Sequence, residues 1–169
     1  MAAGDVKLVL PASANATITL ASLASSATLV AGRESTAIDN TTNLYPDYGV
    51  SGFISTGTTP TAGTIEVWCY SQIDDVPTYP DVMDGTDSVE TVTSADIKRA
   101  SMRLVAALKT DTTSDRKYPF SLTSIRGLFG GILPARFGFF VVHDTVAALN
   151  ATAGNHQVTT KGEYFNVAA

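Results

Sequence analysis

The sequence predicts an all-β fold: an antiparallel, jelly-roll-like β-sandwich of eight to nine strands, with one short helical turn near residues 124–130. Apolar and polar residues alternate along most of the chain, and Gly, Pro, Asn and Asp separate the alternating segments. No long segment has an unambiguous helical spacing. Threonine (23 residues) and alanine (22) are the commonest residue types, and threonine favours β-structure.

The 169 residues correspond to about one domain. We expect an N-terminal arm at residues 1–15 and a single β-sandwich domain at residues 16–169. The arm lacks the pattern of a signal peptide, because Asp5 precedes Lys7 and Pro11 ends an apolar run of only three residues. It is therefore expected to be a short ordered segment.

The first strands are predicted where alternation is clear, at residues 16–20, 27–31 and 48–55. Residues 56–63 have the composition of a turn, and residues 64–71 form the clearest strand. The segments on either side of this turn are predicted to form a hairpin. One face of the strand at 64–71 carries Ile65, Val67 and Cys69, and the other carries Glu66, Trp68 and Tyr70.

Residues 72–96 are predicted to form a long acidic loop, because two prolines and Gly85 interrupt any regular element. Loops of this length are usually functional or packed over the body of a domain. Four acidic residues follow at three-residue intervals from Asp81 to Glu90. Calcium-binding EF-hand loops instead place ligands at positions one, three and five, so a solvated acidic loop is favoured over a cation site.

Residues 94–109 fit two structures. Apolar residues lie near helical spacing after Ser94, which could cap a helix, but residues 102–109 also alternate as a strand does. We favour the strand, because the neighbouring segments are strands and a turn follows at residues 111–115.

The remaining strands are predicted at residues 116–122, 137–144 and 157–167. Pro119 has no backbone donor, which places the first of them at a sheet edge or ends it there. Residues 137–144 are apolar on both faces, as in a central strand. Ser124 is expected to cap the short helical turn, which ends at the glycine pair that follows.

The net charge of −5 is divided unevenly along the chain. Residues 34–97 contain 11 acidic residues and no Lys or Arg, whereas residues 98–136 contain eight basic and two acidic residues. Two interpretations remain open. The loops of the two segments pair within one molecule, or an acidic surface on one copy meets a basic surface on the next and steers assembly.

The residues argue against several functions. The acidic balance argues against direct nucleic-acid binding, the longest apolar run (137–142) is too short for a membrane span, and a single cysteine excludes a disulfide scaffold. His143 is expected at the rim of a sheet, and Asp144 beside it points to the opposite face. Two distant histidines and Cys69 have no metal-ligand spacing. We therefore expect no enzymatic activity, no cofactor and no metal.

Several strings of the sequence resemble small virion proteins of tailed bacteriophages. They are Ser22-Leu-Ala-Ser-Ser-Ala-Thr-Leu-Val-Ala-Gly-Arg-Glu-Ser-Thr36, Glu66-Val-Trp68, Thr112-Thr-Ser-Asp-Arg116, Pro119-Phe-Ser-Leu122, Leu128-Phe-Gly-Gly131, Leu133-Pro134, Phe139-Phe-Val-Val-His-Asp144 and Gly154-Asn-His156. The similarity runs over about residues 17–167. These strings are typical of a family and contain no catalytic motif.

Such virion proteins resemble head decoration, or cement, proteins of the jelly-roll type. The resemblance implies a non-enzymatic structural protein at the virion surface that binds the major capsid protein from outside and stabilises the shell. It also implies a homo-oligomer, a dimer or a trimer, and assigns no contact residues.

Candidate contacts with the capsid or with other copies therefore come from the residues themselves. We expect them in the N-terminal arm, in the acidic loop and on the edge strand near Pro119. The candidate residues are Lys7, Leu10, Asp74, Asp75, Asp81, Asp84, Asp87, Arg116 and Lys117.

Two alternative functions are kept. One is another virion component, in the head–tail connector, the tail or a fibre. The other is a carbohydrate-binding β-sandwich module, which needs a row of exposed aromatic residues on one face. Trp68 and Tyr70 alternate correctly for such a row, and Tyr45, Tyr48 and Tyr79 lie nearby in the sequence. No nucleic-acid or membrane partner is expected.

Overall fold

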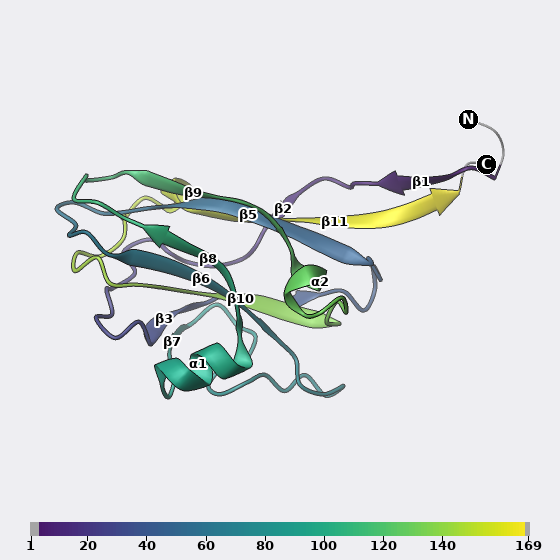
Figure 1. Cartoon of the computed structure of the whole chain (residues 1–169), viewed down its shortest axis with the longest axis horizontal. Helices are drawn as coiled ribbons and strands as arrows, with labels where there is room; N and C mark the ends of the chain where they lie inside the picture. The colour runs from purple at the N-terminus through teal and green to yellow at the C-terminus, as the bar shows by residue number, and fades with distance from the viewer. Residues whose placement is uncertain (1–3, 168–169) are drawn as a thin grey trace.

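The structure, a computed structural model, describes residues 4–167 and consists of two antiparallel sheets that pack face to face (Figure 1). In the first sheet the strand order is β1-β11-β5-β9, and β2 also pairs with β11. In the second sheet the order is β7-β3-β10-β6-β8, and β4 also pairs with β10. Within the described residues, eight strands have four or more residues and three are shorter. The predicted all-β sandwich is confirmed.

The elements have the following bounds. The first sheet contains β1 (Val6–Val9), β2 (Ala14–Asn15), β5 (Asp47–Ser55), β9 (Lys117–Ser124) and β11 (Gln157–Val167). The second sheet contains β3 (Ala31–Glu34), β4 (Ile38–Asp39), β6 (Thr64–Ser71), β7 (Val89–Thr91), β8 (Arg103–Lys109) and β10 (Arg136–His143). The short helices are α1 (Ala95–Ser101), α2 (Ile125–Leu128) and the 3-10 turn η1 (Ala153–Asn155).

The main core lies between the two sheets. Alternate side chains of β10 and β6 point into it, and β5 supplies the facing layer from the first sheet. The predicted division of β6 into two faces is confirmed. The fully buried members of this core include Val50, Ile54, Ile65, Val67, Cys69, Phe137, Phe139 and Val141.

A second, smaller core lies on the outer face of the second sheet. It contains the other faces of β6 and β10, with Trp68, Tyr70, Phe140 and Val142. Tyr70 packs over Gly138 on the neighbouring strand, where a Cβ atom would meet the tyrosine hydroxyl at 2.2 Å. Residues 79–102, here called the cover segment, close this core with side chains that include Met83, Val92 and Met102.

A buried charged group fastens the cover segment to the sheet. Lys98 of α1 is 2% exposed, and its ammonium group lies 2.7 Å from the carboxylate of Glu66 and 5.0 Å from the ring centroid of Trp68. It also donates to the backbone carbonyl of Leu29. The Trp68 indole N–H donates to the same Glu66 carboxylate at 2.8 Å. The charge on Lys98 is therefore compensated inside the fold.

Glu34 fastens the other half of the cover segment. Its fully buried carboxylate accepts the backbone N–H of Gly85 at 2.7 Å and that of Asp84 at 3.2 Å. Burial raises the pKa of this carboxyl above its ordinary value, although these hydrogen bonds favour the charged form. Gly85 has a φ of +81°, and a Cβ atom there would lie 2.7 Å from the ring of Tyr79, so glycine is required at this point.

Three early expectations are corrected by the structure. Residues 16–20 are not a strand, although Ala16, Ile18 and Leu20 do pack on the main core. They cross between the sheets, with single backbone hydrogen bonds to Val158 on one side and Thr36 on the other.

The strand predicted at residues 27–31 begins later than expected. Residues 27–30 form a turn, because the hydroxyl of Ser26 accepts the backbone N–H groups of Val30 and Ala31 and because Leu29 has a φ of +55°. The strand therefore begins at Ala31. The third correction concerns the predicted hairpin, since β5 and β6 belong to different sheets and residues 56–63 carry the chain from one sheet to the other.

Residues 94–109, whose pattern fits either a helix or a strand, contain one of each. Ser94 caps α1 by accepting the N–H of Ile97 at 3.1 Å, and β8 follows as the predicted strand. The predicted loop at 72–96 is not wholly irregular, because β7 pairs with β3 inside it and α1 begins at its end. The short turn capped by Ser124, the central strand β10 and the edge position of β9 agree with expectation.

Replacing Lys98 by Met should destabilise the domain by about 3 kcal/mol, because Glu66 keeps a largely buried charge without its counter-ion. Arg99→Met is the matched control, since Arg99 is 65% exposed and pairs with Asp96 at the surface, where such pairs contribute less than about 1 kcal/mol. Urea unfolding monitored by Trp68 fluorescence measures both variants. Adding Glu66→Gln to Lys98→Met should restore part of the loss. Equal midpoints for the two single variants would contradict this account.

Candidate docking surfaces

The arm and the end of the last strand form one projecting ribbon. Val6–Val9 pair antiparallel with residues 164–167 of β11, and Figure 1 shows this pair extending away from the sandwich. β2 pairs with β11 further along, at Thr159 and Thr160. Lys7 thus lies in the ribbon, and Leu10 lies at its root beside Asp47 and Glu163.

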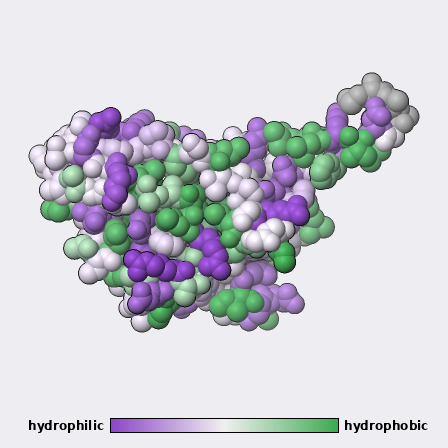
Figure 2. Space-filling view, in the orientation of Figure 1, coloured by the Kyte–Doolittle hydropathy of each residue, from purple (hydrophilic) through white to green (hydrophobic). Residues whose placement is uncertain are grey.

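One face of the ribbon is wholly apolar. Residues that pair directly across an antiparallel ladder share a face, so Val6 and Val167 lie on the same side as Leu8 and Phe165. The opposite face carries Lys7 with Asn166 and Val9 with Tyr164. The apolar side chains are 50–65% exposed, and Figure 2 shows hydrophobic surface along the projection. The exposed apolar residues are Val6, Leu8, Leu10, Phe165 and Val167.

Exposed apolar residues gather at the end of the sandwich from which the ribbon projects, here called the ribbon end. It also holds the turns at residues 43–46, 72–78 and 129–135, which adjoin the paired residues Arg136, Asp39 and Asp47. Of the fifteen large hydrophobic residues exposed among residues 4–167, ten lie here, which makes this end the candidate contact surface. They are the five of the ribbon together with Leu44, Ile73, Val76, Leu122 and Ile132.

The acidic residues of the cover segment are engaged within the molecule. Asp87 pairs with Arg33 at 2.6 Å and accepts two hydrogen bonds from Thr19. Burial would raise the pKa of Asp87, but these partners outweigh it and hold that pKa below its ordinary value. Asp81 accepts the N–H and hydroxyl of Thr93, and Asp84 accepts those of Thr86. These three candidates fasten loops.

Asp74 and Asp75 are placed differently, at the exposed tip of the turn at 72–78. The only hydrogen bond that the structure gives to either carboxylate within residues 4–167 is a long one, 3.3 Å, from the N–H of Thr78 to Asp74. Exposed Ile73 and Val76 flank them, at 67% and 75% exposure. The tip therefore presents two acids between two apolar side chains at the ribbon end.

Arg116 and Lys117 lie at the opposite end of the sandwich, here called the turn end, where residues 56–63 and 110–116 connect strands. Arg116 pairs with Asp111, whose carboxylate also accepts the hydroxyl of Tyr118 at 2.7 Å. That hydrogen bond, with others from Thr113, lowers the pKa of Asp111 to about 2. Lys117 lies over the ring of Phe53. Because the turn end and the ribbon lie at opposite ends of the sandwich, one flat interface cannot contact both Arg116 and Lys117 and the ribbon.

The acidic and basic segments of the sequence pair with one another inside the molecule. Lys98 with Glu66, Arg99 with Asp96 and Arg136 with Asp39 each join the two segments. This supports the interpretation of internal pairing. The remaining charge asymmetry at the surface is smaller than the sequence indicates.

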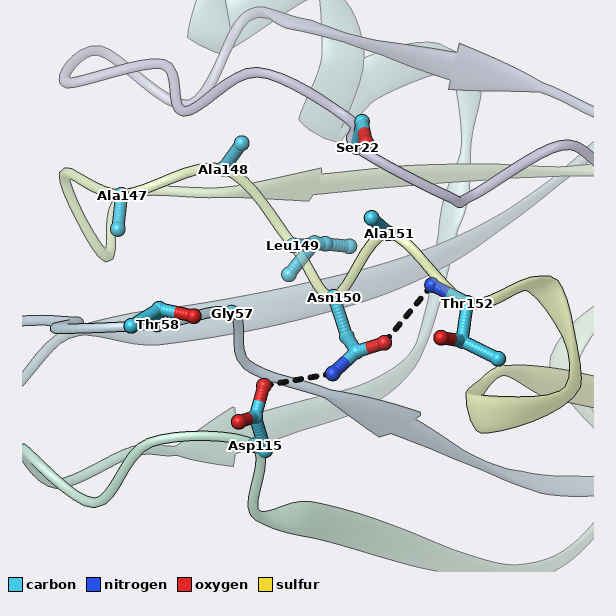
Figure 3. Close-up of a pocket in the computed structure, with 10 residues that line it drawn as sticks. All are labelled: Ser22, Gly57, Thr58, Asp115, Ala147, Ala148, Leu149, Asn150, Ala151 and Thr152. Carbon is cyan, nitrogen blue, oxygen red and sulfur yellow. Dashed lines mark hydrogen bonds between the residues drawn. The ribbon is translucent and has the colours of Figure 1, made fainter.

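A shallow hollow of about 380 Å³ lies at the turn end (Figure 3). Its walls are mostly alanines and backbone of residues 147–152. Asn150 donates to Asp115 at 2.6 Å and accepts the N–H of Thr152 at 2.8 Å, so its amide is occupied by the loops that it joins. The lining side chains contain no histidine, cysteine, lysine or arginine, which leaves this hollow without an acid–base or nucleophilic pair.

The buried titratable residues are part of the core. His143 was expected at a rim, yet it is fully buried at the end of β10. Its Nε2 donates to the carbonyl of Leu23 at 3.0 Å, and Nδ1 lies 2.9 Å from the hydroxyl of Thr145. Burial lowers the pKa of His143, and burial raises that of the Cys69 thiol, which lies in the main core as predicted.

The aromatic row proposed for carbohydrate binding is not at the surface. Trp68 is 6% exposed and Tyr70 is fully buried, both beneath the cover segment, and Tyr48 lies in the main core. These three side chains cannot stack on a sugar. The alternative of a carbohydrate-binding module therefore loses the Trp68 and Tyr70 row, while Tyr45 and Tyr79 are half-buried.

The described residues hold neither a metal-ligand cluster nor a helix that could span a membrane. No three His, Cys, Asp or Glu side chains of residues 4–167 come together as metal ligands, and none of the helices there has the length and hydropathy of a membrane span. Comparisons with protein-family models, with curated proteins and with solved structures find no match to this chain.

The sequence pointed to Lys7 and Leu10 but missed the residues that make the ribbon apolar. The signal was present, because apolar residues alternate at 6, 8 and 10 and again at 165 and 167. The missing information was the pairing of segments about 160 positions apart, which alternation alone does not specify.

The free energy of unfolding should fall as the pH is lowered through 6.5, the ordinary pKa of histidine. Burial lowers the pKa of both His143 and His156 in the folded state, so the unfolded chain binds protons that the folded chain does not. Urea unfolding across this range should show a shallower pH dependence in His143→Asn and in His156→Asn than in the wild-type protein. Parallel pH profiles in all three proteins would contradict the burial of these rings.

Proposed function

We propose that this protein is a non-enzymatic structural component of a bacteriophage virion that binds the outer surface of the capsid and stabilises it. The sequence strings that resemble small virion proteins and the all-β sandwich support this proposal. Its partner is the major capsid protein, and the ribbon end faces the shell.

The observation that carries the proposal is the concentration of exposed apolar side chains at the ribbon end. Single exposed apolar residues are ordinary on a protein surface, but a cluster rimmed by polar residues marks a protein contact. The tip formed by Ile73, Asp74, Asp75 and Val76 lies at this end, as do the exposed Leu44 and Ile132. An apolar and acidic surface of this kind fits a shell surface with apolar pockets and basic residues.

Stabilisation follows from repetition rather than from one strong interface. A shell offers many equivalent sites, so each copy that bridges two neighbouring shell subunits opposes their separation. If copies are also joined to one another, binding at one site raises the effective concentration at the next. Modest single contacts then hold a whole shell.

The direct test adds purified protein to expanded heads that lack decoration. The protein should sediment with the heads in a saturable ratio and should raise the temperature at which the heads release DNA. Absence of binding, or binding that leaves the release temperature unchanged, would overturn the proposal. Saturable binding to tails instead of heads would indicate that the protein belongs to the tail rather than to the capsid surface.

Changing the tip should weaken head binding. The double variant Ile73→Asp with Val76→Asp should reduce affinity for heads at least about tenfold, because it places charges where apolar contact is expected. Val146→Asp is the control, since Val146 is 73% exposed but lies at the turn end. A loss of binding in Val146→Asp with no loss in the tip variant would place the contact at the turn end.

A further inference from the structure

We infer that the apolar face of the ribbon is covered by the same face of a second copy of this chain. This inference concerns self-association and does not depend on the proposed role in a virion. The face consists of Val6, Leu8, Leu10, Phe165 and Val167, defined above.

The ribbon needs a cover for its own stability. Beyond the sandwich it consists of only two strands, β1 and the end of β11, and an isolated two-stranded ribbon is marginally stable in water. Within residues 4–167 the five apolar side chains remain 50–65% exposed, so the body of the same chain does not cover them. Contact with another protein surface supplies the missing layer.

The chemistry of the face fits a copy of itself. Along the paired residues it carries no charged side chain, because Lys7 lies on the opposite face and Glu163 adjoins only Leu10 at the root. Because the paired residues are apolar, packing this face against the same face of a second copy buries no charge between them. A two-fold axis forms such an interface from one patch on each copy. The side chains of two twisted ribbons then interdigitate as in a small β-sandwich.

The area is sufficient for a dimer only if the contact continues past the ribbon. Five half-exposed side chains of this size offer roughly 400–500 Å² on each copy, so face-to-face packing buries on the order of 900 Å², just below the ~1,000 Å² of a stable interface. A hollow of about 350 Å³ at the root of the ribbon, on the same face, extends this surface. Its lining includes Leu10 and Leu122, the latter 70% exposed, with Lys161 and Glu163 beside them.

Antiparallel packing of two ribbons uses this hollow. A two-fold axis across the ribbons brings the tip of each, at Val6 and Val167, toward the root of the other. Leu10 and Leu122 in that hollow offer apolar contact to the incoming valines. The ribbon face and the root hollow together make a self-complementary surface.

The test compares two neighbouring positions on opposite faces of one strand. Phe165→Glu and Asn166→Glu each add one negative charge, but only the first lies on the apolar face. Sedimentation velocity over a range of protein concentrations should show a wild-type oligomer. It should also show self-association weakened at least about 100-fold in Phe165→Glu and unchanged in Asn166→Glu. Thermal unfolding and near-ultraviolet dichroism of the sandwich should be the same in all three proteins.

Cysteine cross-linking gives an independent measurement that does not require a disruptive change. Under oxidation, Leu8→Cys should form a disulfide between copies, whereas Lys7→Cys on the opposite face should not. The natural Cys69 is buried and does not compete.

A monomeric wild-type protein at all accessible concentrations would overturn the inference, as would equal self-association of Phe165→Glu and Asn166→Glu. If the wild type is monomeric and Phe165→Glu still abolishes binding to heads, the shell protein covers the ribbon. That result would refute the self-association and leave the proposed function standing.

Discussion

Phe139 and Phe140 are neighbours in β10, and each is fully buried on a different side of the second sheet. A strand that is apolar on both faces must be covered on both, and the rest of the molecule is arranged around this constraint. The first sheet covers one side and creates the main core. The cover segment at residues 79–102 closes the other side, where no third sheet is present among the described residues.

Many acidic residues of the segment 34–97 hold parts of the fold together. Glu34, Glu66, Asp81 and Asp87 hold the cover segment and the neighbouring turns in place, through backbone N–H groups, hydroxyls, Arg33 and Lys98. Acids in this part of the sequence are therefore largely structural. The charges left for intermolecular contact are few, and the exposed apolar residues of the ribbon end carry the proposed interactions.

Some of this was predictable from the sequence and some was not. Period-two alternation located β6, β8 and β11, a run apolar on both faces located β10, and the caps at Ser94 and Ser124 mark real helix starts. Alternation also placed Ala16, Ile18 and Leu20 correctly toward the core but did not reveal that their backbone crosses between sheets. Sheet membership, the pairing of β1 with β11 and the partner of Lys98 depend on contacts between distant segments, which local patterns do not encode.

This fold requires the cover segment to be a packed layer rather than a mobile acidic loop, and amide hydrogen exchange in the intact protein tests this directly. The N–H groups of Val92 and Met102, bonded to Val30 and Lys98, should exchange only with global unfolding, at the rate of Phe139 in β10. Asp75 at the exposed tip should exchange much faster. If Val92 and Met102 exchange as fast as Asp75 while β10 stays protected, the second core does not hold the segment and the account is wrong.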